Sequence, residues 1–145
     1  MKHLITLFTI FFTGALLAQH NPVSFNISQS SDTIIFDAVI EDGWHMYAVH
    51  LPNPNEGPLP TEFIIDSTEH FNLVEPVIEE EGHTEMDDAF GIEVKYFEKN
   101  VTFKQPIKVL TQEEFHITGT ISYMVCNDQM CIPFDVPLNY SFLKD

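Results

Sequence analysis

The amino-acid sequence predicts an all-β fold, an immunoglobulin-like antiparallel β-sandwich. Three observations support this prediction: short runs rich in β-branched and aromatic residues, turn residues between these runs, and no helical periodicity outside the N-terminal segment. A small barrel is the alternative. The chain of 145 residues is long enough for one hydrophobic core, so we expect a single domain over residues 19–145.

The segment before this domain, residues 1–18, has the pattern of a secretory signal peptide. Lys2 provides a basic start, and an apolar run follows that reaches Ala18, after which cleavage is expected. An uncleaved membrane anchor is the alternative, but it needs about 18 consecutive apolar residues, and this run is shorter and contains threonine and glycine. We therefore expect an exported domain that does not insert into the membrane after cleavage, in a compartment where disulfides form.

The composition is strongly acidic and excludes some classes of partner. The chain has 22 Asp and Glu residues against 6 basic residues, all of them lysine, and a formal net charge of −16. Nucleic acid is a poor partner, because binding its backbone requires clusters of Lys and Arg. Anionic membrane surfaces are disfavoured for the same reason. The high charge is sufficiently explained by solubility in an exported space.

The N-terminal half of the domain is expected to form strands separated by loops. After a polar lead-in, residues 32–50 have the composition of two strands, separated by the turn signal Asp42-Gly43. The segments that follow are a proline-rich loop, two short strands and an acidic loop bounded by glycines, at residues 51–60, 61–67, 71–80 and 81–91.

The C-terminal half is expected to form four further strands. Residues 92–110 provide two of them around the turn at Lys99-Asn100, and residues 114–126 and 131–142 provide the last two. Because side chains alternate across a strand, each of the last two strands has one apolar face and one polar face. The chain's two cysteines, Cys126 and Cys131, both lie on the polar faces.

The last two strands are expected to pair as a hairpin, because one register matches their apolar faces throughout. A slip of one residue would move the whole apolar set of one strand to the wrong face. The expected register pairs Tyr123 with Phe134, Ile121 with Val136, Ile117 with Tyr140, Phe115 with Phe142, and Cys126 with Cys131.

Two prolines locate this hairpin in the sheet. Pro133 and Pro137 share the parity of Cys131, and a proline cannot donate to a ladder, so that parity points its backbone away from the hairpin partner. The cysteines then form a non-hydrogen-bonded pair, with Cα atoms about 4.5 Å apart, at the short end of disulfide geometry. The same argument makes residues 131–142 an edge strand.

The spacing of the cysteines leaves their role open. A disulfide that closes a short, outward-facing hairpin stabilises less than a long-range one, and an accessible disulfide of this kind can exchange with other thiols. A passive surface staple is an equally good interpretation, since such staples are common in exported domains. A metal site needs two further ligands, and the local candidates are only Asp128, Met130 and distant histidines.

The wording of three motifs points to a family. The segments "EDGWHMYA", "DDAFGIEVKYFEKNVTFKQPIKV" and "GTISYMVCNDQMCIPF" resemble, in this order, the N-terminal periplasmic domain of the thiol:disulfide interchange protein DsbD. The resemblance implies an immunoglobulin-like sandwich with an exposed cysteine pair, located in the periplasm, without a cofactor. It also implies electron transfer between a DsbD-type membrane reductase or thioredoxin-like proteins and exported acceptors, including those of cytochrome c biogenesis.

The resemblance also implies roles for individual residues. Cys131 is similar to the cysteine that forms the mixed disulfide with partners, and Cys126 to the one that resolves it. Phe90 matches the aromatic residue of a cap loop that covers the pair. The resemblance further places four residues around the cysteines: the acidic Asp87 and Asp88 before the cap aromatic, and the aromatic Trp44 and Tyr47. Tyr123, just before the first cysteine, is placed there as well.

The sequence departs from the family in two respects, and other functions remain open. Phe134 stands where the family often has a second proline. The chain stops at Asp145, so we expect either a stand-alone relative with a separately encoded membrane partner or a relative whose role has diverged. The main alternative is a non-catalytic binding module whose disulfide is structural. A copper chaperone using His45, Met46 and His50 is a third reading, although scattered His and Met are usually surface or packing residues.

Overall fold

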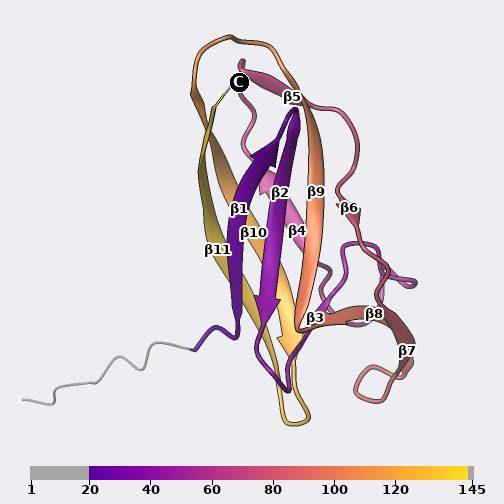
Figure 1. Cartoon of the computed structure of the whole chain (residues 1–145). Coiled ribbons are helices and arrows are strands. Elements are labelled where there is room, and N and C mark those ends of the chain that lie inside the picture. The colour runs from indigo at the N-terminus through magenta and orange to yellow at the C-terminus, as the bar shows by residue number, and fades with distance from the viewer. Residues whose placement is uncertain (1–19, 144–145) are drawn as a thin grey trace, which may run out of the picture.

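The computed structural model describes residues 20–143 as two facing antiparallel sheets (Figure 1). The predicted signal peptide, residues 1–18, lies outside the described residues. The first sheet contains β1 (Val23–Ser30), β2 (Thr33–Ile40), β9 (Asn100–Val109), β5 (Phe71–Leu73) and β6 (Ile78–Glu79). The second contains β11 (Cys131–Phe142), β10 (Phe115–Cys126), β4 (Glu62–Ile65), β3 (His45–Tyr47), β8 (Ile92–Glu98) and β7 (His83–Asp87).

The hydrophobic core lies between the two sheets. We call it the main core; its largest fully buried members are Ile34, Phe36, Val101 and Phe103 from the first sheet and Met46, Ile117, Ile121, Tyr123, Val125 and Phe142 from the second. The all-β prediction is confirmed, and the two separate sheets form a sandwich rather than the alternative barrel. Within residues 20–143, nothing has the helical length and apolar character that crossing a membrane requires.

The C-terminal hairpin has the register that the sequence predicts. Tyr123 pairs with Phe134, Ile121 with Val136 and Cys126 with Cys131. β11 has β10 as its only neighbour in the described sheet, which confirms the edge strand. The long strands of this hairpin carry the cysteines to one end of the sandwich, the lower end in Figure 1, whereas β5 lies at the other.

Three expectations for other segments are corrected. The polar lead-in contains β1, which pairs along its whole length with β2. The expected acidic loop 81–91 contains β7, whose five residues pair with β8 although most of their side chains are exposed. The expected strand 71–80 is divided into β5 and β6, and each of them pairs with β9. β7 has no apolar alternation in its sequence and is held by backbone pairing with β8, so the sequence alone does not indicate a strand there.

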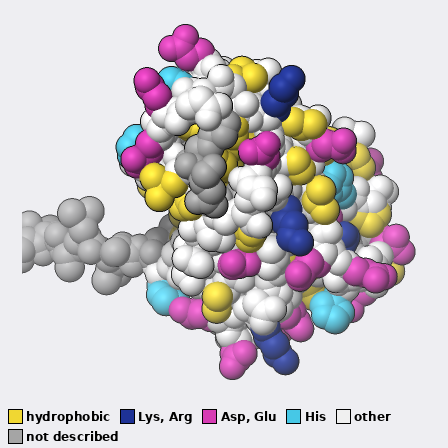
Figure 2. All heavy atoms as spheres, turned by 45° about the horizontal axis from the view of Figure 1, so that its top comes forward, with side chains coloured by type: hydrophobic (Ala, Val, Ile, Leu, Met, Phe, Trp, Pro, Cys, Tyr) yellow, Lys and Arg dark blue, Asp and Glu magenta, His cyan; other side chains and the backbone are white. Residues whose placement is uncertain are grey.

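The surface has the acidic character that the composition implies. On the face shown in Figure 2, acidic side chains are spread among isolated basic ones, and apolar side chains form separate small spots. Such scattered apolar residues are normal for a folded domain. This face therefore offers no obvious binding surface.

Candidate functional site

The Cys126–Cys131 disulfide closes the tip of the β10–β11 hairpin. The two Cα atoms are 4.1 Å apart, close to the expected distance for a non-hydrogen-bonded pair. The tip is held by Asn127, whose N–H donates to the carbonyl oxygen of Met130 at 2.9 Å. The Asn127 side-chain oxygen accepts from the N–H groups of Gln129 and Met130, each at 2.9 Å. The bridge thus lies beside a well-ordered turn.

The two cysteines differ sharply in exposure. Cys131, on the edge strand, is exposed, whereas Cys126 is only 2% exposed. The expectation that both cysteines are accessible is therefore wrong for Cys126. Although it faces away from the main core, a second layer of side chains covers it. A reagent or partner reaches the sulfur of Cys131 first.

The layer over Cys126 is a small hydrophobic cluster on the outer face of the second sheet. We call it the cysteine cluster; its buried members are Tyr47, Val94 and Cys126, and its partly buried members are Leu51, Phe90, Ile92, Tyr96 and Met124. These residues come from β3, β8, β10 and the loops around them. Cys126 is buried because these distant segments fold over it.

Asp87 connects the cysteine cluster to the loop that we call the cap loop, residues 88–91. One oxygen of its carboxylate accepts from the N–H groups of Ala89 at 2.8 Å and Phe90 at 3.2 Å. Its other oxygen accepts from the hydroxyl of Tyr47 at 2.8 Å. The Phe90 ring meets the Tyr47 ring edge-on, with centroids 6.2 Å apart. A single carboxylate thus fixes the turn that places Phe90 on Tyr47.

A hollow of about 350 Å³ lies between this layer and the hairpin tip. It is lined by both cysteines, His45, Tyr47, Asn127 and the residues 85–89, together with Asp128. Burial and the hydrogen bond to Asp87 raise the pKa of Tyr47 above its ordinary value. Tyr47 therefore stays protonated and keeps donating to Asp87 well into the alkaline range.

The structure brings together most of the residues that the sequence assigns to the site, but not all of them. Asp87 and Asp88 line the hollow, and Tyr47 and Phe90 belong to the cysteine cluster. Trp44 and Tyr123 instead pack with the main core. Tyr123 is 2% exposed, and its hydroxyl donates to Asn21 at 3.0 Å. Both are separated from the cysteine cluster by the second sheet, because their side chains point to its inner face.

His45 is a residue of the site that the sequence analysis did not assign to it. It pairs with Cys126 across β3 and β10, and its side chain lines the hollow beside both cysteines. The sequence indicates that His45 and Tyr47 share one face of a strand, because they are two residues apart. It does not indicate that this three-residue strand pairs with β10 beside Cys126. Burial lowers the pKa of His45 below its ordinary value, although the nearby carboxylates act in the opposite direction.

The residues considered for copper do not converge. Met46 is fully buried in the main core, while His50 lies on the surface beside Glu79, with their side chains 3.4 Å apart. Residues 20–143 contain no group of three or more His, Cys, Asp or Glu side chains that could hold a metal ion.

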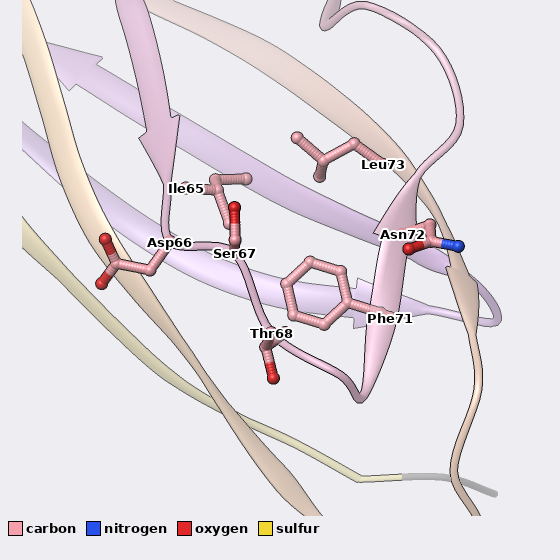
Figure 3. A pocket seen from close by; sticks show the side chains of 7 residues that line it. All are labelled: Ile65, Asp66, Ser67, Thr68, Phe71, Asn72 and Leu73. Atoms are coloured by element: carbon pink, nitrogen blue, oxygen red, sulfur yellow. The ribbon is translucent and has the colours of Figure 1, made fainter.

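A second hollow, of about 130 Å³, lies between the end of β4 and β5 (Figure 3). Figure 3 shows the Phe71 ring below Leu73, with Ile65 and Ser67 to the left. Its carboxylate, Asp66, accepts a hydrogen bond from the Thr118 hydroxyl at 2.7 Å. It has no cysteine or histidine among its lining residues, so the cysteine end of the molecule is the better candidate site.

The chain matches the model of a known protein family. The family described as "Thiol:disulfide interchange protein DsbD, N-terminal" matches residues 13–140, which is most of the chain and includes both cysteines. A comparison with curated proteins finds no match.

Several solved structures have the same fold. The N-terminal domain of Neisseria meningitidis DsbD in its reduced form superposes with a TM-score of 0.62 at 17% identity, covering 88% of this chain and 91% of that one. The same domain in a complex with the PilB N-terminal domain superposes with a TM-score of 0.59 at 14% sequence identity, covering 86% of each chain. The N-terminal periplasmic domain of Proteus mirabilis ScsB superposes with a TM-score of 0.53 at 23% sequence identity, covering 88% of this chain but 49% of that one. The predicted immunoglobulin-like sandwich is confirmed by these likenesses.

Proposed function

The chain belongs to the family of the N-terminal domain of the thiol:disulfide interchange protein DsbD, and we propose that it exchanges electrons through Cys126 and Cys131. The observation that carries this proposal is the asymmetry of the disulfide. Cys131 is exposed on an edge strand, and Cys126 is buried under the cysteine cluster. A staple needs no such asymmetry, whereas an exchanger uses it to define which sulfur a partner attacks.

The reaction is dithiol–disulfide exchange. A thiolate of a reducing partner attacks the Cys131 sulfur, the Cys126 sulfur leaves, and a mixed disulfide joins the partner to Cys131. A second thiol of the partner then attacks the partner's own sulfur and releases the reduced domain. The same steps in reverse reduce an acceptor disulfide. Two electrons move in each cycle, and no cofactor takes part.

The surroundings of the disulfide favour a slow and selective exchanger. Asp87, Asp88 and Asp128 line the hollow beside the cysteines. Negative charge near a thiol opposes formation of the reactive thiolate. Phe90 and the cap loop cover Cys126 from the other side. Exchange then depends on a partner that displaces the cap loop as it docks.

The partners and location follow from the family and the sequence. We infer a periplasmic domain of residues 19–145, released by cleavage of a signal peptide over residues 1–18. Its electron donors and acceptors are thioredoxin-like proteins and a DsbD-type membrane reductase, in a system such as cytochrome c biogenesis. In support, the matching domain of ScsB is periplasmic, and a DsbD N-terminal domain forms a complex with the N-terminal domain of PilB.

The test is the redox equilibrium of the folded domain with glutathione and with a reduced thioredoxin. Thiols are trapped by alkylation and counted by mass, and the experiment is repeated with Cys126→Ser and Cys131→Ser. We expect ready equilibration of the wild-type domain. With oxidised glutathione as the source of the disulfide, Cys126→Ser should form a stable mixed disulfide and Cys131→Ser should not. A pair that stays oxidised until the domain unfolds would identify a structural staple and favour the binding-module function.

A further inference from the structure

Four residues form a row across the outer face of the second sheet, from its edge inward. Cys131 of β11 pairs with Cys126 of β10, Cys126 pairs with His45 of β3, and His45 pairs with Glu98 of β8. Side chains of directly opposed residues lie on the same face with Cβ atoms about 4.5–5.5 Å apart. An imidazole therefore lies next to the buried sulfur, on the side opposite to its disulfide partner.

A hydrogen bond to Tyr47 bears on which nitrogen of the neutral imidazole carries the hydrogen. Its Nε2 atom lies 3.4 Å from the hydroxyl oxygen of Tyr47, and that hydroxyl already donates its own hydrogen to Asp87. A neutral ring that donates to the Tyr47 oxygen carries its hydrogen on Nε2 and its lone pair on Nδ1. The neutral ring is thus able to accept a proton.

The aromatic neighbours hold the ring in place. The Tyr96 ring lies 4.8 Å from the His45 ring, centroid to centroid, and the Tyr47 ring lies 5.2 Å away, edge-on. His45 is partly buried and lines the same hollow as both cysteines. A group held in this way is pre-organised for proton transfer to a fixed neighbour.

We propose that His45 is the proton-transfer partner of Cys126 during exchange. This inference rests on the proposed function, and it adds an acid–base group to a reaction that otherwise relies on solvent. The pairing assigns the role to the buried cysteine rather than to Cys131, because Cys126 lies between His45 and Cys131 in the row. The exposed Cys131 can exchange its proton with water.

In the opening step, a partner thiolate attacks the Cys131 sulfur and the disulfide bond breaks. The electron pair of that bond goes to the Cys126 sulfur. At a pH low enough for His45 to be protonated, the imidazolium gives its proton to this sulfur. The products are the mixed disulfide, the Cys126 thiol and neutral His45. The partner sulfur is oxidised and the Cys126 sulfur is reduced, so charge and electrons balance.

In the closing step, Cys126 gives its proton to neutral His45 and its sulfur attacks Cys131 in the mixed disulfide. The Cys126–Cys131 bond forms again and the partner leaves as a thiolate. A thiol with an ordinary pKa near 8.5 is only a few per cent ionised at pH 7, so an adjacent base can accelerate this step by about tenfold or more.

Burial and the nearby carboxylates shift the pKa of His45 in opposite directions. Burial lowers its pKa, which keeps the ring neutral and ready for the closing step at neutral pH. Carboxylates raise the pKa from three sides: Asp87 and Glu85 of β7, Glu98 of β8, and Asp128 of the hairpin tip. The other titratable groups against the ring are the hydroxyls of Tyr47 and Tyr96. The wild-type closing rate should therefore fall only when the pH drops through a value below 6.5.

The experiment measures the closing step alone. Reduced protein is mixed in a stopped-flow instrument with dithiobis(nitrobenzoate), which forms a mixed disulfide at Cys131 and releases one thionitrobenzoate. Attack by Cys126 then releases the second, at a rate that does not depend on reagent concentration. Wild type, His45→Gln and the control His116→Gln are compared from pH 5.5 to 9. His116 is a matched control because it lies exposed at the other end of β10.

We expect His45→Gln to slow the second release about tenfold at pH 7 while the first release changes less than twofold. Its closing rate should fall about tenfold for each pH unit below about 8.5, as for an unassisted thiol. His116→Gln should behave as wild type. A His45→Ala variant, folded by its thermal unfolding curve, should recover part of the rate when imidazole is added to the buffer.

The possible failures are distinct. A second release that is as fast in His45→Gln as in wild type would overturn the role of His45 and leave the exchange intact. Equal slowing of both releases, without recovery by imidazole, would indicate a structural role and also overturn it. A wild-type protein that never gives a second release would overturn the exchange itself.

Discussion

The two faces of β10 differ in what holds them together. On the inner face, five residues from Phe115 to Val125 are at most 4% exposed and belong to the main core. The Phe115 ring stacks between the rings of Phe71 and Phe142, with centroids 5.5 Å and 5.0 Å away. On the outer face, only the cysteine end is covered, by a cluster with three buried members. The inner face packs in the core that joins the two sheets, and the covered end of the outer face buries Cys126.

This difference indicates how a small sandwich can carry reactive chemistry without losing its fold. The main core depends on apolar area distributed over both sheets, so no single contact at the cysteine end is needed for folding. The cysteine cluster depends on a few aromatic contacts and on the hydrogen bonds of Asp87. A region with few buried apolar contacts opens at a lower free energy than the core. We therefore expect local opening at the cysteine end to expose Cys126 while the rest of the domain stays folded.

The largest expected effect comes from a change in the main core. Phe36 is fully buried, so Phe36→Ala should lower the free energy of unfolding by about 3–5 kcal/mol through lost burial and a cavity. Urea unfolding followed by circular dichroism measures this loss. In the fraction that remains folded, the rate of reduction of the disulfide should be unchanged.

An exposed residue of the same sheet is the control for this prediction. Ile78 of β6 is 51% exposed, and Ile78→Ala should change the stability by less than about 0.5 kcal/mol. A change in the reduction rate of folded Phe36→Ala, measured below its unfolding transition, would contradict the separation of the two regions.

The cap loop gives a smaller effect, on reactivity rather than stability. Phe90→Ala removes the aromatic contact with Tyr47, and such contacts contribute about 0.5–1.5 kcal/mol. In a Cys131→Ser background, alkylation of Cys126 should therefore accelerate about twofold to tenfold. Mass spectrometry after timed quenching measures this rate.

Leu73→Ala, at an exposed position of β5 at the other end of the sandwich, provides the control and should leave the alkylation rate unchanged. If Cys126 reacts no faster in the Phe90→Ala protein, the cap loop does not protect it, and another member of the cysteine cluster must be responsible for its low exposure.

The sequence predicts the inner face of the hairpin better than the outer one, for a physical reason. The alternation from Phe115 to Phe142 is dense on both strands, and only one register buries both apolar sets. β7 has no such alternation, since its side chains are largely exposed and its place depends on backbone pairing with β8. The missed β1 is intermediate: Val23, Phe25 and Ile27 alternate with polar residues, but a single weak run is hard to tell from a polar lead-in.

The candidate site could be predicted only in part, because its residues come from several distant segments. The cysteines and Phe90 were identified through their local motifs, and the structure places them together. The burial of Cys126 depends on how β8 and the cap loop fold over β10, which no local pattern contains. Tyr123 lies just before Cys126, but its strand parity turns it toward the main core, and Trp44, which directly precedes β3, also packs with that core. The position of His45 follows from two pairings of the short β3, which only the tertiary structure reveals.

The smallest expected effect is a loss of stability at alkaline pH, and it compares a tyrosine of the cysteine cluster with one of the main core. Burial raises the pKa of Tyr47 in the cysteine cluster and of Tyr123 in the main core, and burial with Glu85 raises the pKa of Tyr96 to about 12. An unfolded tyrosine ionises near its ordinary pKa of 10.0, so above that pH unfolding releases protons. The stabilisation is complete below pH 10 and is lost as the pH rises toward the folded-state values, which urea midpoints between pH 8 and 11.5 can follow.

Tyr47→Phe and Tyr123→Phe should each flatten this alkaline decline, because each removes one group whose pKa differs between the two states. At pH 7, each should cost about 1 kcal/mol for the lost hydrogen bond, to Asp87 and Asn21 respectively. Only Tyr47→Phe should also accelerate alkylation of Cys126, since only Tyr47 connects Asp87 and the cap loop to the cysteine cluster. Equal acceleration by Tyr123→Phe would mean that Cys126 becomes accessible through general loosening of the sandwich and not through local opening at the cysteine end.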